Sequence, residues 1–271
     1  MIVFPHAKIN LGLSIISKRP DGFHNLETIF YPIPMRDALE IVLSDKNMFN
    51  QTGIKIPGNE SDNLVLRAYH MLEKQYPFIK PLKIHLHKAI PLGAGLGGGS
   101  SDAAEILQLI DRFFTLNISP GKLSGFASDL GSDCPFFMQS KPCFATGKGE
   151  ILEPLQLNLS EYSMLLVHPE IRINTVWAFS KIRPSLPKYS LKKMISKPVN
   201  DWVHMISNDF EVPVFEAYPQ LQVIKRQLYN AGAIYASMTG SGSTIYALFN
   251  KSCLPDITFE NATQTAIPKL K

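Results

Sequence analysis

The sequence lacks several features that would point to whole classes of protein. It has only three cysteines, Cys134, Cys143 and Cys253, whose spacing fits neither a metal site nor a disulfide framework. No apolar run reaches the roughly 18 residues of a membrane span, and no charged-then-apolar leader opens the chain. Lysine and arginine form no polybasic run, so nothing predicts binding to nucleic acid. We therefore expect a cytoplasmic protein of a reducing compartment that binds neither membranes nor nucleic acids.

Apolar residues make up 45% of the 271 residues, which is enough for a substantial hydrophobic core. A chain of this length forms one large domain or two smaller ones. The formal net charge of +4 suits an anionic substrate, but it is equally typical of an ordinary solvated surface. Composition alone therefore leaves the function open.

The most informative stretch is the glycine-rich run of residues 91–104, in which five glycines fall within seven positions. Glycine takes positive φ readily and brings backbone N–H groups close to an anion. Ser100 and Ser101 are good helix N-cap residues, and apolar residues at helical spacing follow them. The run therefore predicts a phosphate-binding loop at the positive end of a helix. The loop residues are Pro91, Leu92, Gly93, Ala94, Gly95, Leu96, Gly97, Gly98, Gly99, Ser100 and Ser101.

Other glycine motifs fit this run less well. Gly93, Gly95 and Gly98 match a dinucleotide fingerprint in spacing, but residues 117–121 read as a new helix start instead of the required second strand. No lysine follows the glycines, as a P-loop requires, and a protein-kinase loop lies between two strands. A flexible linker is a poor interpretation because an amphipathic helix adjoins the run.

Strand and helix patterns occupy the rest of the chain. Residues 8–15 alternate as a half-buried strand whose polar face carries Lys8 and Asn10. Ser61 or Asp62 is expected to cap the next helix. Asp133 follows the end of another helix and precedes Pro-Phe-Phe, so its carboxylate either lies in apolar surroundings or serves as a plain N-cap.

The second half of the chain also mixes strands and helices. Strands are expected at residues 162–167, 233–238 and 244–249, with a helix at about 219–231. A glycine turn at residues 239–243 fits either a hairpin or a ligand contact.

Seven motifs together resemble those of the 4-diphosphocytidyl-2-C-methyl-D-erythritol kinase family, within the superfamily of galactokinase, homoserine kinase, mevalonate kinase and phosphomevalonate kinase (GHMP kinases). They are residues 7–11, 21–26, 91–104, 131–137, 147–150, 208–211 and 238–242. The resemblance implies an ATP-dependent kinase, with Mg²⁺ accompanying ATP, that phosphorylates the 2-hydroxyl of a substrate carrying cytidine diphosphate in non-mevalonate isoprenoid synthesis. It also implies an α+β fold with two lobes and the active site in the cleft. The expected lobes are a ribosomal-protein-S5-like lobe at 1–155 and a ferredoxin-like lobe at 156–271.

The resemblance further implies roles for single residues. Lys8 and Asp133 match the family's catalytic pair. Asp133 would accept the proton of the attacking hydroxyl, and Lys8, within hydrogen-bond reach, would keep Asp133 ionised and stabilise charge on the transferred group. The matching substrate positions are Asn10, Phe23, His24, Thr175, Phe179, Gly240 and Ser241. The family usually has Tyr at position 23, and Phe keeps the stacking face but loses the hydroxyl. The sequence names no protein ligand for Mg²⁺.

Rival functions remain at this point. Another small-molecule kinase of the superfamily, of homoserine or mevalonate type, shares the phosphate loop, and so does the decarboxylase branch. A non-catalytic ligand sensor on the same scaffold should have lost the pair Lys8 and Asp133, which this chain retains. The oligomeric state stays open between a monomer and a weak dimer.

Overall fold

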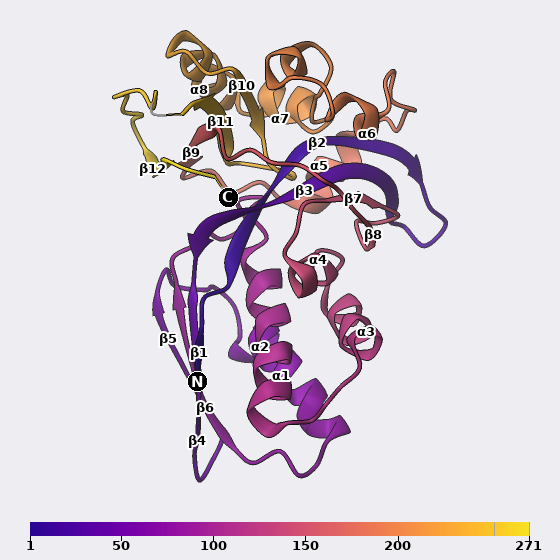
Figure 1. Ribbon diagram of the computed structural model, residues 1–271, viewed down its shortest axis with the longest axis vertical. Helices are drawn as coiled ribbons and strands as arrows, with labels where there is room; N and C mark the ends of the chain where they lie inside the picture. The colour runs from indigo at the N-terminus through magenta and orange to yellow at the C-terminus, as the bar shows by residue number, and fades with distance from the viewer. Residues whose placement is uncertain (252, 271) are drawn as a thin grey trace. The chain divides into compact units, whose positions relative to one another are not determined.

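The computed structural model describes residues 1–251 and 253–270, which form two compact units (Figure 1). The first unit comprises Met1–Ala7, Met35–Leu92 and Gly97–Ser140, and the second comprises Lys8–Pro34, Gly93–Leu96 and Lys141–Lys271. The boundaries of these units differ from the lobe boundary expected near residue 155. That two-lobe division stays a prediction. The difference arises because early strands pair with the strands after residue 140.

The first unit is a four-stranded sheet with helices packed on one face. Strand order is β1-β4-β6-β5, in which β5 and β6 are parallel and the other pairs antiparallel. The strands are β1 (Ile2–Val3), β4 (Ala38–Leu43), β5 (Met48–Gly53) and β6 (Leu82–Lys88). The helices are α1 (Leu64–Gln75), α2 (Gly98–Phe114), α3 (Pro120–Leu130), α4 (Cys134–Gln139) and the 3₁₀ turn η1 (Glu60–Asp62). Apolar residues that alternate along β4 and β6 meet the apolar faces of α1 and α2 in one core, as their spacing predicts.

The second unit contains two antiparallel sheets. One has the order β2-β3-β7-β8 and the other β10-β11-β9-β12. The strands are β2 (His6–Lys18), β3 (His24–Arg36), β7 (Cys143–Thr146), β8 (Ile151–Pro154), β9 (Tyr162–Pro169), β10 (Tyr235–Met238), β11 (Ile245–Asn250) and β12 (Ala262–Ile267). The helices are α5 (Thr175–Lys181), α6 (Leu191–Met194), η2 (Val199–His204), α7 (Glu211–Ala217) and α8 (Pro219–Asn230). One core cluster joins β2, β9, β10 and β11 to α5, α7 and α8.

Two helices begin at residues other than those expected. The N-cap of α1 is Asn63, whose side chain accepts the Val65 amide, because Ser61 and Asp62 lie in the preceding 3₁₀ turn. The helix α2 starts at Gly98, so Ser100 and Ser101 lie inside its first turn instead of capping it. The cap position is Gly97, in the left-handed conformation (φ 70°), which glycine takes without steric cost. Among the described residues, no helix is long and apolar enough to cross a membrane.

Candidate functional site

The glycine run is a series of left-handed turns that leads into α2. Gly93, Gly95 and Gly97 have φ of 61°, 76° and 70°, a conformation that L residues with a side chain rarely adopt. A backbone bent in this way turns successive N–H groups toward one side, and the first turn of α2 adds its own unpaired N–H groups. The structure therefore confirms a glycine loop that opens a helix.

The middle of this loop is held by close packing against the turn that follows β10. A Cβ on Gly95 would lie 1.9 Å from the carbonyl oxygen of Thr239, so only glycine can occupy the position. The Thr239 hydroxyl donates to the Gly95 carbonyl (3.0 Å), and a Cβ on Gly240 would lie 3.1 Å from the Gly95 Cα. The glycine turn after β10 is thus a hairpin turn that also supports the glycine loop.

Lys8 and Asn10 lie side by side on β2 in a buried polar network. The Lys8 ammonium donates to Asn10 Oδ1 (2.6 Å) and lies 5.1 Å from the centre of the Phe30 ring. Asn10 Nδ2 donates to Thr28 Oγ1 (2.9 Å), and the Asn10 amide donates to Thr239 Oγ1 (3.0 Å). The Lys8 amide donates to the Leu96 carbonyl (2.9 Å). The predicted catalytic lysine is therefore buried, held by hydrogen bonds, and joined through its backbone to the glycine loop.

Asp133 occupies the N-cap position of α4 in the first unit. It is half-buried, and although it occupies the N-cap position its side chain makes no capping hydrogen bond. The residues that follow it, Cys134 to Phe137, are all buried. A Cβ on Gly131 would lie 3.4 Å from Cys134 Sγ and 4.0 Å from Ser100 Oγ, so the turn that carries Asp133 lies against the first turn of α2. A carboxylate is thereby presented beside the start of the loop helix.

Four predicted substrate residues come together in two pairs in the second unit. The rings of His24 and Phe179 stack, with centroids 5.0 Å apart and planes 20° apart, and the edge of Phe210 supports Phe179. The hydroxyls of Thr175 and Ser241 lie 3.2 Å apart. Burial lowers the pKa of His24, which favours a neutral ring that can both donate and accept a hydrogen bond.

Phe23 stands apart from these pairs in its immediate contacts. It follows the turn at Asp21, whose carboxylate accepts the Phe23 amide (3.1 Å), and it is 53% exposed. The Lys148 ammonium lies 4.6 Å from the centre of its ring, in a cation–π contact. An exposed aromatic face of this kind is available to a ligand.

Two residues of the site's framework were not predicted as such. Thr239 joins Asn10 to Gly95 through its hydroxyl. Asn208 donates from its Nδ2 to the carbonyls of Met238 and Gly240, both at 2.8 Å, and so holds the second glycine turn. Both residues lie in motifs already named, but their partners are far away in sequence. Local sequence patterns therefore could not predict these hydrogen bonds.

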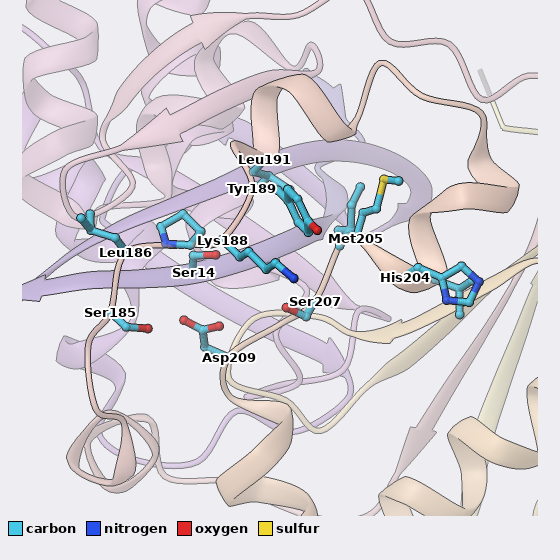
Figure 2. A pocket seen from close by; sticks show the side chains of 13 residues that line it. Ser14, Ser185, Leu186, Lys188, Tyr189, Leu191, His204, Met205, Ser207 and Asp209 are labelled. Carbon is cyan, nitrogen blue, oxygen red and sulfur yellow. The ribbon is translucent and has the colours of Figure 1, made fainter.

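A separate cavity of about 450 Å³ lies in the second unit. Figure 2 shows the polar ends of Ser185, Lys188, Ser207 and Asp209 directed toward its middle. Burial raises the pKa of Asp209, whose Oδ2 accepts the Ile15 amide (2.7 Å). None of the predicted site residues lines this cavity.

Sequence comparison relates the chain to known proteins over nearly its whole length. Residues 63–141 match the GHMP kinases N terminal domain, and residues 191–256 match the GHMP kinases C terminal domain. A 4-diphosphocytidyl-2-C-methyl-D-erythritol kinase of Parabacteroides distasonis is 53% identical over 251 residues, which are 93% of this chain and 92% of that protein. The kinase of the same name from Bacteroides thetaiotaomicron is 51% identical over 261 residues, covering 94% and 95% of the two chains.

Solved structures show the same fold. A crystal structure of 4-(cytidine 5'-diphospho)-2C-methyl-D-erythritol kinase matches with a TM-score of 0.76 and 30% identity, covering 92% of this chain and 90% of that one. The mevalonate kinase of Methanococcus jannaschii matches with a TM-score of 0.72 at 16% identity, over 100% and 98% of the two chains. The second match supports the fold alone.

Proposed function

The chain belongs to the 4-diphosphocytidyl-2-C-methyl-D-erythritol kinase family of the GHMP kinases, and on this premise we propose its reaction. The protein is an ATP-dependent small-molecule kinase. Its substrate is 4-diphosphocytidyl-2-C-methyl-D-erythritol, which it phosphorylates in non-mevalonate isoprenoid synthesis. The expected family, kinase fold and reaction are thereby confirmed. The observation that supports this family and reaction is the identity of about 50% to the two kinases named above, over more than nine-tenths of this chain.

The loop's own chemistry fits the phosphates of ATP. Ser101 Oγ, in the first turn of α2, is buried and has no hydrogen-bond partner within the described part of the chain. A buried hydroxyl left unpaired is costly unless a ligand satisfies it. Together with the left-handed glycines and the positive end of a 17-residue helix, it supports the binding of an anion at this place.

Mg²⁺ enters our proposal with the nucleotide. Bound together with the nucleotide, it would supply positive charge that neutralises the charge developing during transfer. Mg²⁺ commonly keeps water and phosphate ligands instead of a protein cage. Within the described residues no cluster of three or more His, Cys, Asp or Glu side chains could hold a metal ion.

The chain's own residues supply positioning and charge, which is what phosphoryl transfer requires. In our proposal Asp133 accepts the proton of the attacking 2-hydroxyl, and its half-buried place at the start of α4 supports this role. Lys8 contributes a fixed positive charge that stabilises the transferred group, because its bond to Asn10 holds the ammonium in place.

Substrate recognition is assigned to the second unit. The stacked rings of His24 and Phe179 offer an aromatic face and a hydrogen-bonding edge, the two features by which proteins hold a pyrimidine. The exposed Phe23 is the further aromatic surface. Asn10, Thr175, Gly240 and Ser241 provide polar groups for the diphosphate and the methylerythritol part.

An assay of ADP release tests the reaction directly. We expect ADP from ATP with 4-diphosphocytidyl-2-C-methyl-D-erythritol, and no release above background with homoserine or mevalonate. Turnover of either control in place of the cytidine substrate would assign the protein to another kinase of the superfamily. Release of CO₂ from a phosphorylated mevalonate would assign it to the decarboxylase branch.

A further inference from the structure

A cluster of three charged residues lies fully inside the first unit and has no part in the reaction described above. The Lys88 ammonium donates to Asp37 Oδ2 and to Asp102 Oδ2, the latter at 2.7 Å. Lys88, Asp37 and Asp102 are each at most 2% exposed. Charges taken so far out of water destabilise the fold unless each is well paired, so this arrangement calls for a function or a strong structural need.

The cluster lies directly behind the phosphate-binding end of α2. A Cβ on Gly98, the first residue of α2, would lie 3.2 Å from Lys88 Nζ and 2.9 Å from Ile90 Cγ2. Asp37 Oδ1 accepts the amides of Ala89 (2.6 Å) and Ile90 (2.9 Å), just before the glycine run. The three side chains therefore join the end of β6, the entry to the loop and the first turns of α2.

The charges in this cluster do not balance. Asp37 accepts three hydrogen bonds, from the amides of Ala89 and Ile90 and from the Lys88 ammonium. In contrast, Asp102 Oδ1 is buried and lacks any partner in the described part of the chain. One ammonium between two carboxylates leaves one net negative charge when both are ionised. That charge lies behind a site built for a polyanion, and like charges repel across a low-dielectric interior.

Resting on the proposed function, we propose that Asp102 takes up one proton from solvent when nucleotide phosphates bind at the start of α2. The bond formed is O–H on the Asp102 carboxyl, and the cluster becomes neutral. ATP and ADP accordingly bind more tightly to the protein with Asp102 protonated than to the protein with Asp102 ionised. Lys88 is the positioning residue that holds this carboxyl behind the loop.

The environment of Asp102 supports such a proton. Burial, the largest cause, raises its pKa to about 7, with Lys88 lowering the pKa and Asp37 raising it. The helix α4, which packs beside α2, brings a neutral group, because burial raises the pKa of the Cys134 thiol to about 11. Farther along α2, Glu105 also has a pKa raised by burial, but Arg112 and Arg36 act on it. Since the pKa of Asp102 lies near neutrality, nucleotide affinity should fall as the pH rises above about 7.

The test measures ADP binding by calorimetry, in saturating Mg²⁺, for the wild type and Asp102→Asn. Asparagine keeps the shape of the side chain and an oxygen for Lys88, but it cannot titrate. At about pH 8 we expect the wild type to take up more protons per ADP than the variant, by about half a proton for a pKa shift of one unit, judged from two buffers of different protonation enthalpy. From about pH 6 to pH 9 the Kd of the wild type should rise relative to the variant by up to about tenfold, the limit for a pKa shift of one unit on binding. The ionisation of ADP itself cancels in this comparison.

Glu105→Gln is the matched control, because it removes another carboxyl of α2 whose pKa burial raises. It should keep the proton uptake of the wild type. Equal proton uptake and equal pH dependence in the wild type and Asp102→Asn would overturn the inference while leaving ADP binding intact. Absence of ADP binding to the wild type would instead overturn the proposed function. If Asp102→Asn does not fold, carbon NMR titration of the wild-type carboxyl decides the matter: its pKa should rise when ADP is added, and an unchanged pKa refutes the proposal.

Discussion

The Thr239 hydroxyl lies 3.0 Å from the Gly95 carbonyl oxygen, and the two backbones approach so closely that no side chain fits at position 95. The glycine loop therefore has a fixed support from the turn after β10. If the loop binds the nucleotide as proposed, its N–H groups are held in place beforehand, which reduces the entropy lost on binding.

This approach gives a first prediction for two glycines of the same loop. Gly95→Ala should destabilise the fold and weaken ATP binding, because the new Cβ overlaps the Thr239 backbone and the left-handed φ adds strain of about 1–2 kcal/mol. Gly93→Ala carries a similar φ but meets no atom within 4 Å, so only the strain should remain. Urea unfolding measures both losses of free energy. Equal losses for the two variants would contradict the support by Thr239.

A second prediction concerns the proposed base. Asp133→Asn should lower kcat by about 10²- to 10⁴-fold, the usual contribution of a general base, with the Kd for ATP unchanged. Steady-state kinetics and calorimetry of nucleotide binding provide the two readouts. Near-normal turnover would remove Asp133 from the reaction.

A third prediction concerns the aromatic pair. Phe179→Ala should raise the KM for the cytidine substrate about tenfold or more, since stacking of a base is worth about 1–3 kcal/mol. The KM for ATP should stay the same. Val176→Ala is a control on the same helix, because Val176 is 79% exposed and packs on little. If both KM values rise equally in Phe179→Ala, the change reports misfolding and not loss of stacking.

A fourth prediction concerns the stability of the fold toward acid. His6 packs against the rings of Phe136 and Phe137, and its Nε2 is buried with no hydrogen-bond partner among the residues described. Burial therefore lowers the pKa of His6 below its ordinary 6.5. The unfolded chain then binds a proton at a higher pH than the folded chain does, so the free energy of unfolding falls as the pH drops below about 6.5.

Urea unfolding at a series of pH values measures this dependence. His6→Phe keeps the aromatic packing and cannot titrate, so the fall in stability below about pH 6.5 should be smaller in the variant. Part of the fall should remain, because burial also lowers the pKa of His168. The same pH dependence in both proteins would show that His6 does not contribute.

Local patterns were sufficient for the elements nearest the site. The helix start expected within residues 117–121 is confirmed, because α3 begins at Pro120. The predicted start of α2, with Ser100 or Ser101 as its cap, was wrong by about one turn, because the helix begins at Gly98. Gly98 and Gly99 have low helix propensity, but the close contacts of Gly98 with Ile90 and Lys88 leave no room for a side chain, and this requirement outweighs propensity.

Contacts between distant residues could not be predicted in this way. The strand β3 contains Pro32 and Pro34, which disguise its pattern, and its pairing with β7 decides how the units divide. The bond of Thr239 to Gly95 and the pairing of Lys88 with Asp37 depend on tertiary packing. Motif resemblance named Lys8, Asp133 and the substrate residues, but only the fold shows that Asn10 fixes the lysine.

The tight fit at Gly95 also constrains how such enzymes can be recombined. Residues 95 and 239 are separated by 144 positions, yet each determines the space left for the other. A chimaera that exchanges the C-terminal portion between two relatives should work only if both parents carry compatible residues at these two positions. Engineering of the nucleotide loop therefore has to treat the distant turn as part of the same design unit.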